Sequence, residues 1–113
     1  MKNYNFAYVF YDIGDKESEV GKRRVTKVFK ICKKYFLHHQ KSVFKGEITP
    51  ANFIKFESEI KKVTDKNLDT ITILRLFRQT DVKEIIIGEM IAIKYFYKLN
   101  LILFQFLLFI HFF

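Results

Sequence analysis

The chain is short, rich in apolar residues and strongly basic. It has 113 residues, 50% of them hydrophobic, and 20 lysines and arginines stand against 12 acidic residues for a net charge of +8. This length suits one domain with a real core, and the apolar fraction excludes a disordered chain. The basic excess favours a polyanionic partner, either nucleic acid or an anionic membrane surface.

The N-terminal segment predicts a buried strand. Residues 6–13 are apolar on both faces until Asp12, and Gly14 follows them, which is typical of a buried strand. The apolar run is too short for a secretory signal, and a single cysteine, Cys32, gives no sign of an oxidising compartment. We therefore expect a cytoplasmic protein.

A polar loop over residues 15–21 precedes the first predicted helix. Its apolar stripe, at helical spacing, consists of Val25, Val28, Phe29, Cys32 and Phe36. A second stripe, wholly basic, consists of Arg23, Lys27, Lys30 and Lys34. No acidic residue occurs between Gly21 and Lys45. Surface helices normally mix charges, so a face of one sign favours a phosphate backbone, with an ordinary solvated face as the alternative.

The remaining elements alternate between strand and helix. Strand character over residues 38–49, with a bend or tight turn near Gly46, leads to a second helix that starts at Thr49-Pro50. Residues 70–77 and 82–87 are β-branched and apolar, so each predicts a strand. This order predicts an α+β fold, a ferredoxin-like βαββαβ sandwich with one antiparallel-rich sheet and two helices on one face.

The C-terminal residues differ from the rest of the chain. We expect a ferredoxin-like domain over residues 1–89 and an atypical apolar tail over residues 90–113. Residues 99–113 are almost continuously apolar, but a membrane span needs about 20 residues. Packing on the sheet or on a partner chain is favoured over membrane insertion, and a tail that is not native, such as a frameshift product, is a third reading.

Asp12 is the main candidate for chemistry. The sequence has no glycine-rich phosphate loop, no zinc-type cysteine pair and no Gly-x-Ser-x-Gly motif, so catalysis would use carboxylates, histidines or a metal. Asp12 either caps the loop at Gly14 or binds a hard cation such as Mg²⁺. In a two-fold dimer, two copies of Asp12 would face each other, and a shared cation would offset their repulsion and activate water.

Two histidines and two arginines are weaker candidates. His38 and His39 are adjacent in a strand, so they point to opposite faces and do not serve one site. Arg75 and Arg78, with Tyr11, are expected to flank the end of the sheet that carries the aspartate, or else to be ordinary surface charges.

Four short motifs together resemble a known family. They are Phe10-Tyr11-Asp12-Ile13, Arg23-Arg24-Val25-x-Lys27-Val28, Gln40-x-Ser42-Val43-Phe44-x-Gly46-Glu47 and Val82-Lys83-Glu84-Ile85-Ile86-Ile87-Gly88. In this order, over residues 4–89, they resemble the small CRISPR-associated endoribonuclease family, CRISPR-associated protein two, of the spacer-adaptation module. Lys45 stands where the family often has an acidic residue, and the apolar tail replaces a usually polar one.

The resemblance implies a ferredoxin-like homodimer that holds Mg²⁺ through the strand-end aspartate, here Asp12, and cleaves RNA or double-stranded DNA. It also implies that the dimer bridges two copies of the spacer integrase and holds DNA for insertion. A non-catalytic nucleic-acid-binding adaptor in the same complex is the alternative. We therefore expect Asp12 to be both metal ligand and catalytic residue. The expected nucleic-acid contacts are Arg23, Arg24, Lys27, Lys30, Lys34, Arg75 and Arg78.

Overall fold

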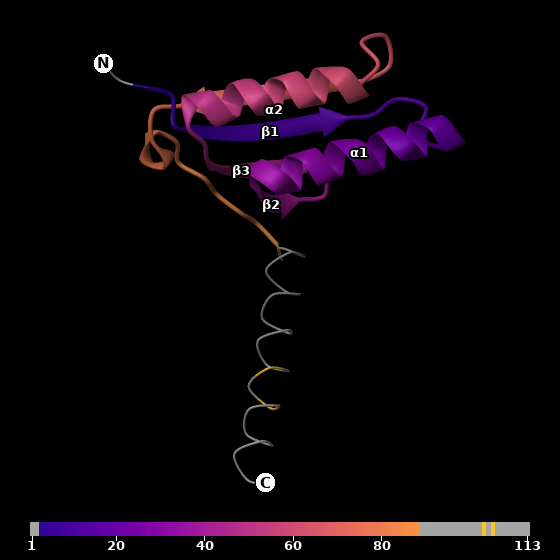
Figure 1. The fold of residues 1–113 in the computed structure, drawn as a ribbon. Helices are drawn as coiled ribbons and strands as arrows, with labels where there is room; N and C mark the ends of the chain where they lie inside the picture. The colour runs from indigo at the N-terminus through magenta and orange to yellow at the C-terminus, as the bar shows by residue number, and fades with distance from the viewer. Residues whose placement is uncertain (1–2, 89–102, 104, 106–113) are drawn as a thin grey trace, which may run out of the picture.

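The computed structural model describes residues 3–88, 103 and 105, and residues 3–88 form one sheet and two long helices (Figure 1). In chain order the elements are β1 (Phe6–Asp12), α1 (Glu19–Tyr35), β2 (Leu37–Gln40), β3 (Val43–Glu47), α2 (Pro50–Val63), β4 (Thr70–Leu76) and a short 3-10 helix (Gln79–Asp81). The sheet order is β2-β3-β1-β4, and every neighbouring pair is antiparallel. The α+β, ferredoxin-like fold expected from the sequence is confirmed.

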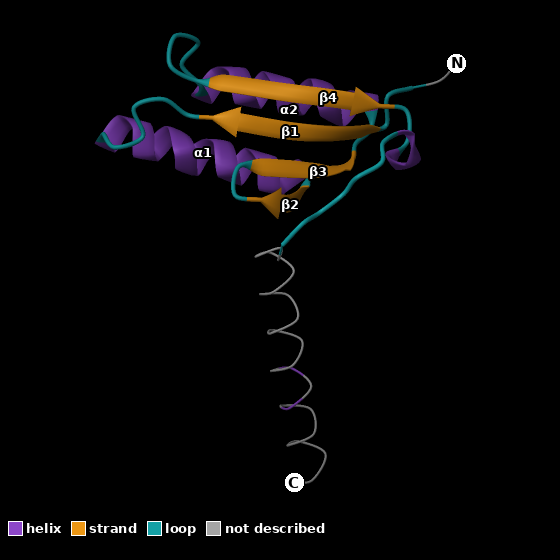
Figure 2. Ribbon diagram, turned by 180° about the vertical axis from the view of Figure 1, so that it is seen from behind, coloured by secondary structure: helices purple, strands orange, loops and turns teal. Residues whose placement is uncertain are grey.

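Both helices cover the same face of the sheet (Figure 2). Residues alternate between the faces of a strand, so Ala7 and Val9 of β1 are fully buried beneath the helices. Cys32 of α1 and Phe56 of α2 are fully buried in the same core, as expected for Cys32. This layer of apolar side chains excludes water and holds the helices on the sheet.

The helix starts follow from their caps. The Ser18 hydroxyl accepts a hydrogen bond from the Gly21 amide at 3.0 Å, so α1 begins at Glu19, inside the loop predicted for residues 15–21. A Cβ atom at position 21 would lie 1.8 Å from the Asp15 carbonyl oxygen, so this close approach requires glycine. The Thr49 cap and Pro50 start predicted for α2 are confirmed.

The predicted bend near Gly46 is wrong. Gly46 lies within β3, opposite Ala7 of β1, and the chain turns instead at residues 41–42, between β2 and β3. A one-residue irregularity between His38 and Gln40 precedes that turn. The turn carries no glycine or proline, so it lacks the usual local signal.

The last predicted strand, residues 82–87, is also not a strand within the described chain. The segment lies over the uncovered face of the sheet, where Glu84 contacts Tyr8 of β1 and Lys45 of β3. Its residues are exposed, and Ile87 is 96% exposed. Its sequence favours a strand, but pairing also needs a free strand edge beside it, and the segment lies over the face of the sheet.

Within the described residues, no helix is long and apolar enough to cross a membrane. The predicted tail, residues 90–113, lies outside the described residues apart from positions 103 and 105.

Candidate metal site and nucleic-acid interface

Asp12 lies at the C-terminal end of β1, opposite Thr70 of β4. Its side chain is 84% exposed, and its Oδ1 atom lies 3.9 Å from the Lys16 Nζ atom. Because the strand alternates, Asp12 shares the uncovered face of the sheet with Tyr8 and Phe10. The strand-end aspartate therefore presents its carboxylate to solvent.

A different aspartate holds the loop at Gly14. The Gly14 amide donates to Asp69 Oδ1 at 3.1 Å, and the Asp65 amide donates to Asp69 Oδ2 at 2.7 Å. Arg24 donates to Asp69 Oδ2 at 3.1 Å and to the Gly14 carbonyl at 2.7 Å. Asp69 therefore performs the loop-capping role considered for Asp12. The Asp12 carboxylate is not used in this cap and is available to a ligand.

The same network determines the role of Arg24. Its side chain is 11% exposed and pairs with Asp69, which is 0% exposed. A buried pair of this kind ties α1 to the loops before α1 and before β4. The Arg24 guanidinium is thus engaged within the fold, and sequence reasoning missed its partner because Asp69 looks like an ordinary polar loop residue.

A cleft lies beside Asp12, and we call it the Asp12 cleft. Its lining residues are Tyr11, Asp12, Ile13, Lys16, Val25, Lys41 and Ser42. The Tyr11 amide donates to the Ser42 carbonyl at 3.1 Å, which brings the β2–β3 turn next to the end of β1. Burial raises the pKa of the Tyr11 hydroxyl to about 12, so it stays protonated at neutral pH.

The predicted basic stripe of α1 divides into free and paired residues. Arg23, Lys27 and Lys30 are exposed and have no acidic partner within 4.0 Å among the described residues. Lys34 donates to Glu59 of α2 at 2.8 Å, and this hydrogen bond raises the pKa of Lys34. Three of the four cations therefore form a basic face, which we define as Arg23, Lys27 and Lys30.

The expectation that Arg75 and Arg78 flank the Asp12 end of the sheet is wrong. Because β4 runs antiparallel to β1, Arg75 lies opposite Ala7, at the other end of β1. The Arg75 guanidinium lies 3.9 Å from the ring centre of Phe53, and Arg78 pairs with Asp81 at 3.2 Å. Each arginine has an intramolecular partner far from Asp12.

The two histidines lie in different surroundings, as expected. His38 is exposed, its ring stacks on Phe44, and its Nε2 atom lies 3.2 Å from the Lys41 carbonyl oxygen. His39 is buried, and its Nε2 atom lies 3.6 Å from Glu84 Oε1. Burial lowers the pKa of His39, and the charge of Lys45 lowers it further. The two side chains serve no common site.

Glu84 is the centre of a second polar cluster that the sequence did not reveal. Lys45 Nζ donates to both Glu84 carboxylate oxygens, at 2.8 and 3.0 Å, and the Tyr8 hydroxyl donates to Glu84 Oε2. The Lys45 hydrogen bond holds the pKa of Glu84 below its usual range. Burial raises the pKa of Tyr8 to about 12. This cluster fastens residues 82–88 to the sheet and explains the basic residue at position 45.

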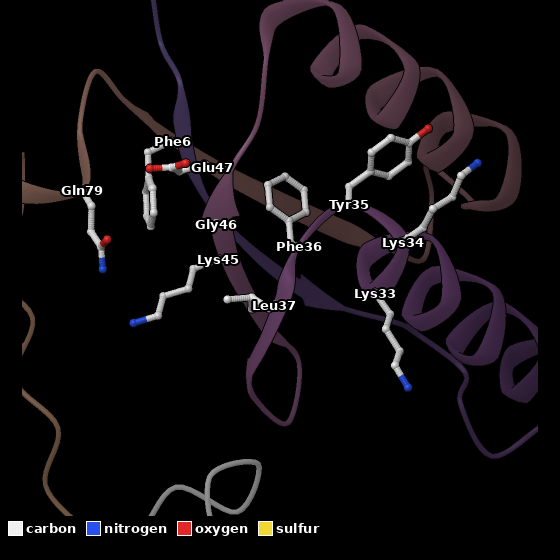
Figure 3. Close-up of a pocket in the computed structure, with 10 residues that line it drawn as sticks. All are labelled: Phe6, Lys33, Lys34, Tyr35, Phe36, Leu37, Lys45, Gly46, Glu47 and Gln79. Carbon is white, nitrogen blue, oxygen red and sulfur yellow. The ribbon is translucent and has the colours of Figure 1, made fainter. Parts of the chain in front are cut away.

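A larger depression lies at the opposite end of the sheet, beside Phe6 and Glu47 (Figure 3). Its polar groups include Lys34 and Lys45, but these pair with Glu59 and Glu84. With one carboxylate, Glu47, and two of its three lysines paired elsewhere, the depression is a weaker candidate for catalysis. The Asp12 end of the sheet is the better candidate.

The donor set suits magnesium as a single-carboxylate site. Among the described residues, no group of three or more His, Cys, Asp or Glu side chains lies close enough to hold a metal. Mg²⁺ often takes one or two protein carboxylates and keeps several waters, and the exposed Asp12 leaves room for them. The described residues therefore include no cluster of nitrogen and sulfur ligands of the kind that transition metals prefer.

These features define a small ferredoxin-like α+β protein with a solvent-facing acid at a strand end and a basic face on α1. The chain belongs to the Cas2 family, because the family described as CRISPR associated protein Cas2 matches residues 5–84. The family resemblance drawn from the sequence motifs is thereby confirmed.

Individual relatives agree with this assignment. The chain is 39% identical over 70 residues to a CRISPR-associated endoribonuclease Cas2 of Thermodesulfovibrio yellowstonii, covering 62% of this chain and 80% of that protein. It is 40% identical over 58 residues to the one from Pyrococcus furiosus, covering 51% and 68% of the two chains. The crystal structure of Streptococcus pyogenes Cas2 superposes with a TM-score of 0.65 at 28% identity, covering 74% of this chain and 99% of that one.

Proposed function

We propose that the protein is a Mg²⁺-dependent endonuclease of CRISPR adaptation, with Asp12 as its metal ligand and catalytic carboxylate. The observation that carries this proposal is the exposed Asp12 carboxylate, which Asp69 releases from a capping role. Relatives named as endoribonucleases support hydrolysis of a phosphodiester. The proposed substrate is RNA or double-stranded DNA.

Different residues of the chain bind the ion and the substrate. A bound Mg²⁺ would polarise the phosphodiester and supply activated water. Asp12 holds the ion, and its exposure leaves that position open to a nucleic-acid strand. The basic face of Arg23, Lys27 and Lys30 binds backbone phosphates, which positions the strand without reading its sequence.

We further propose that the protein works as a homodimer. Phe10 and Leu74 are apolar and exposed on the uncovered sheet face, and Ile85 and Ile87 are exposed on the segment that crosses it. Burying such a surface against a second copy is favourable. A two-fold axis through this face would bring two copies of Asp12 to one junction, where the two carboxylates would together hold a cation that offsets their repulsion.

A non-catalytic adaptor is the second candidate. It is favoured by the small inventory of acids, one exposed carboxylate at the site in each chain. In this role the dimer bridges two copies of the spacer integrase and holds double-stranded DNA through the basic face of α1. The two roles are compatible, since Asp12 and the basic face are different residues.

A cleavage assay separates the two candidates. For the nuclease, Asp12→Asn should reduce Mg²⁺-dependent cleavage about 100-fold or more, because the metal loses its protein ligand. The matched control is Glu17→Gln, which neutralises another exposed carboxylate of the loop after β1 and should leave the rate unchanged. Undiminished cleavage by purified Asp12→Asn protein would remove the nuclease proposal and leave the adaptor.

A further inference from the structure

The Asp12 cleft combines groups from three separate parts of the chain. Asp12 comes from β1, Lys16 from the loop before α1, and Lys41 with Ser42 from the β2–β3 turn. None of the sequence motifs joins these residues into one site, because their proximity depends on the antiparallel pairing of β1 with β3.

The β2–β3 turn is held in place at the cleft. The Ser42 carbonyl accepts from the Tyr11 amide at 3.1 Å. The Lys41 carbonyl lies 3.2 Å from the Nε2 atom of His38, whose ring stacks on buried Phe44. Both contacts use main-chain atoms of the turn, so the Lys41 ammonium group and the Ser42 hydroxyl are not needed to position it.

The charges of the cleft favour an anion. Its lining includes two lysines, Lys16 and Lys41, and a single carboxylate, Asp12, and the Lys16 Nζ atom lies 3.9 Å from that carboxylate. Lys41 is exposed, and its ammonium group has no acidic partner within 4.0 Å among the described residues. A lone exposed ion pair such as Lys16–Asp12 contributes little to stability, and it does not account for Lys41 and Ser42 at the same cleft.

The size of the cleft limits which ligands it can hold. Its volume of about 130 Å³ is well below the roughly 300 Å³ at which pockets hold whole small molecules. A single phosphate group suits this space better than a complete nucleotide. Lysine is a common phosphate ligand, and a serine hydroxyl donates to a phosphate oxygen.

We propose that Lys16, Lys41 and Ser42 form a phosphate-binding subsite beside Asp12, which holds one backbone phosphate of the nucleic acid next to the metal ligand. Lys16 and Lys41 bind the non-bridging oxygens, and the Ser42 hydroxyl donates a hydrogen bond to one of them. These residues are positioning groups, and only their effect on cleavage rests on the proposed nuclease function.

Binding without cleavage tests the subsite directly. The probe is a fluorescently labelled double-stranded DNA in EDTA, titrated with the full chain at several salt concentrations. Lys41→Gln should weaken binding about fivefold to tenfold and reduce the salt slope by about one released counterion. The matched control, Lys55→Gln, removes an exposed lysine of α2 outside the cleft and should change affinity less than Lys41→Gln.

Four further variants sharpen the test. Lys41→Arg should restore most of the affinity, and Ser42→Ala should weaken binding about twofold to threefold. In EDTA, Asp12→Asn should strengthen binding, because it removes a negative charge from the phosphate subsite. Wild-type affinity in a Lys16→Gln/Lys41→Gln double variant, or no DNA binding by the native chain, would overturn the proposal.

The binding and cleavage experiments test the subsite proposal and the nuclease proposal independently. If Asp12→Asn cleaves as well as the native protein while Lys41→Gln loses affinity, the nuclease proposal fails and the subsite stands. If cleavage requires Asp12 while Lys41→Gln and Ser42→Ala leave affinity, KM and kcat unchanged, the subsite proposal fails and the nuclease stands.

Discussion

Two aspartates near one end of the sheet have opposite environments and therefore opposite roles. The side chain of Asp69 is fully buried and accepts hydrogen bonds from Arg24, Gly14 and Asp65. Asp12 is exposed and has only a long contact with Lys16. A buried carboxylate requires such partners, whereas an exposed one is available to a ligand.

We predict that Asp69→Asn destabilises the fold, because the substitution leaves the Arg24 charge buried without its counter-ion. The expected loss is about 3 kcal/mol in the free energy of unfolding, measured by urea denaturation. Asp12→Asn is the paired control and should change the free energy of unfolding by less than about 0.5 kcal/mol. Equal effects of the two substitutions would contradict the assigned roles.

Titration of His39 makes the stability of the fold depend on pH. Burial first, and the charge of Lys45 second, lower its pKa in the folded state below the ordinary value of 6.5; Glu84 opposes this shift. The unfolded chain therefore binds more protons, so stability is full above pH 6.5 and falls as the pH drops toward the folded-state pKa. Glu84 acts in the same direction only below its ordinary pKa of 4.5.

Thermal unfolding between pH 7.5 and 5.5 measures this effect. The native chain should lose stability across the interval, and His39→Gln, which cannot titrate, should flatten the curve. His38→Gln is the control, because that ring is exposed and its removal should leave the slope unchanged. An identical slope for native and His39→Gln proteins would argue against His39 as the titrating group.

At the scale of elements, local sequence pattern predicted both helices, β1 from its apolar run and β4 from its β-branched residues. It failed where pairing depends on distant residues. Gly46 looked like a turn but pairs with Ala7 inside β3, and residues 82–87 have strand character but cross the sheet face. The local sequence pattern indicates which face of a segment is apolar. It does not indicate which strand of the sheet the segment will pair with.

The segment of residues 82–88 should loosen when its anchor is removed. Glu84→Ala eliminates the contacts with Lys45 and Tyr8, so trypsin should cleave after Lys83 faster than in the native chain. Glu57→Ala is the control, because it breaks only the surface pair with Lys61. A cleavage rate unchanged by Glu84→Ala would show that other contacts hold the segment.

For the whole molecule, the exposed apolar face predicts self-association. Phe10→Asp places a charge on the uncovered sheet face, so it should convert the proposed dimer to monomers in sedimentation experiments. Ile54→Asp places the same charge on the exposed surface of α2 and should leave the dimer intact. A native chain that sediments as a monomer at all concentrations would contradict the dimer proposal.

The sequence identified part of the candidate site and missed the rest for a geometric reason. Asp12 and the basic stripe of α1 lie in single elements, so local pattern was enough to find them. The positions of Lys41 and Arg75 relative to Asp12 depend on strand direction and register. Antiparallel pairing placed Lys41 at the cleft and moved Arg75 to the far end of the sheet.

The central claim is that Asp12 binds the divalent ion at a junction of two identical chains. A calorimetric titration of the native protein with Mn²⁺, which prefers the same oxygen ligands as Mg²⁺, tests it most directly. We predict one ion for every two chains, and loss of this binding in Asp12→Asn with the dimer retained. Binding of Mn²⁺ to Asp12→Asn with native affinity and stoichiometry would contradict the claim.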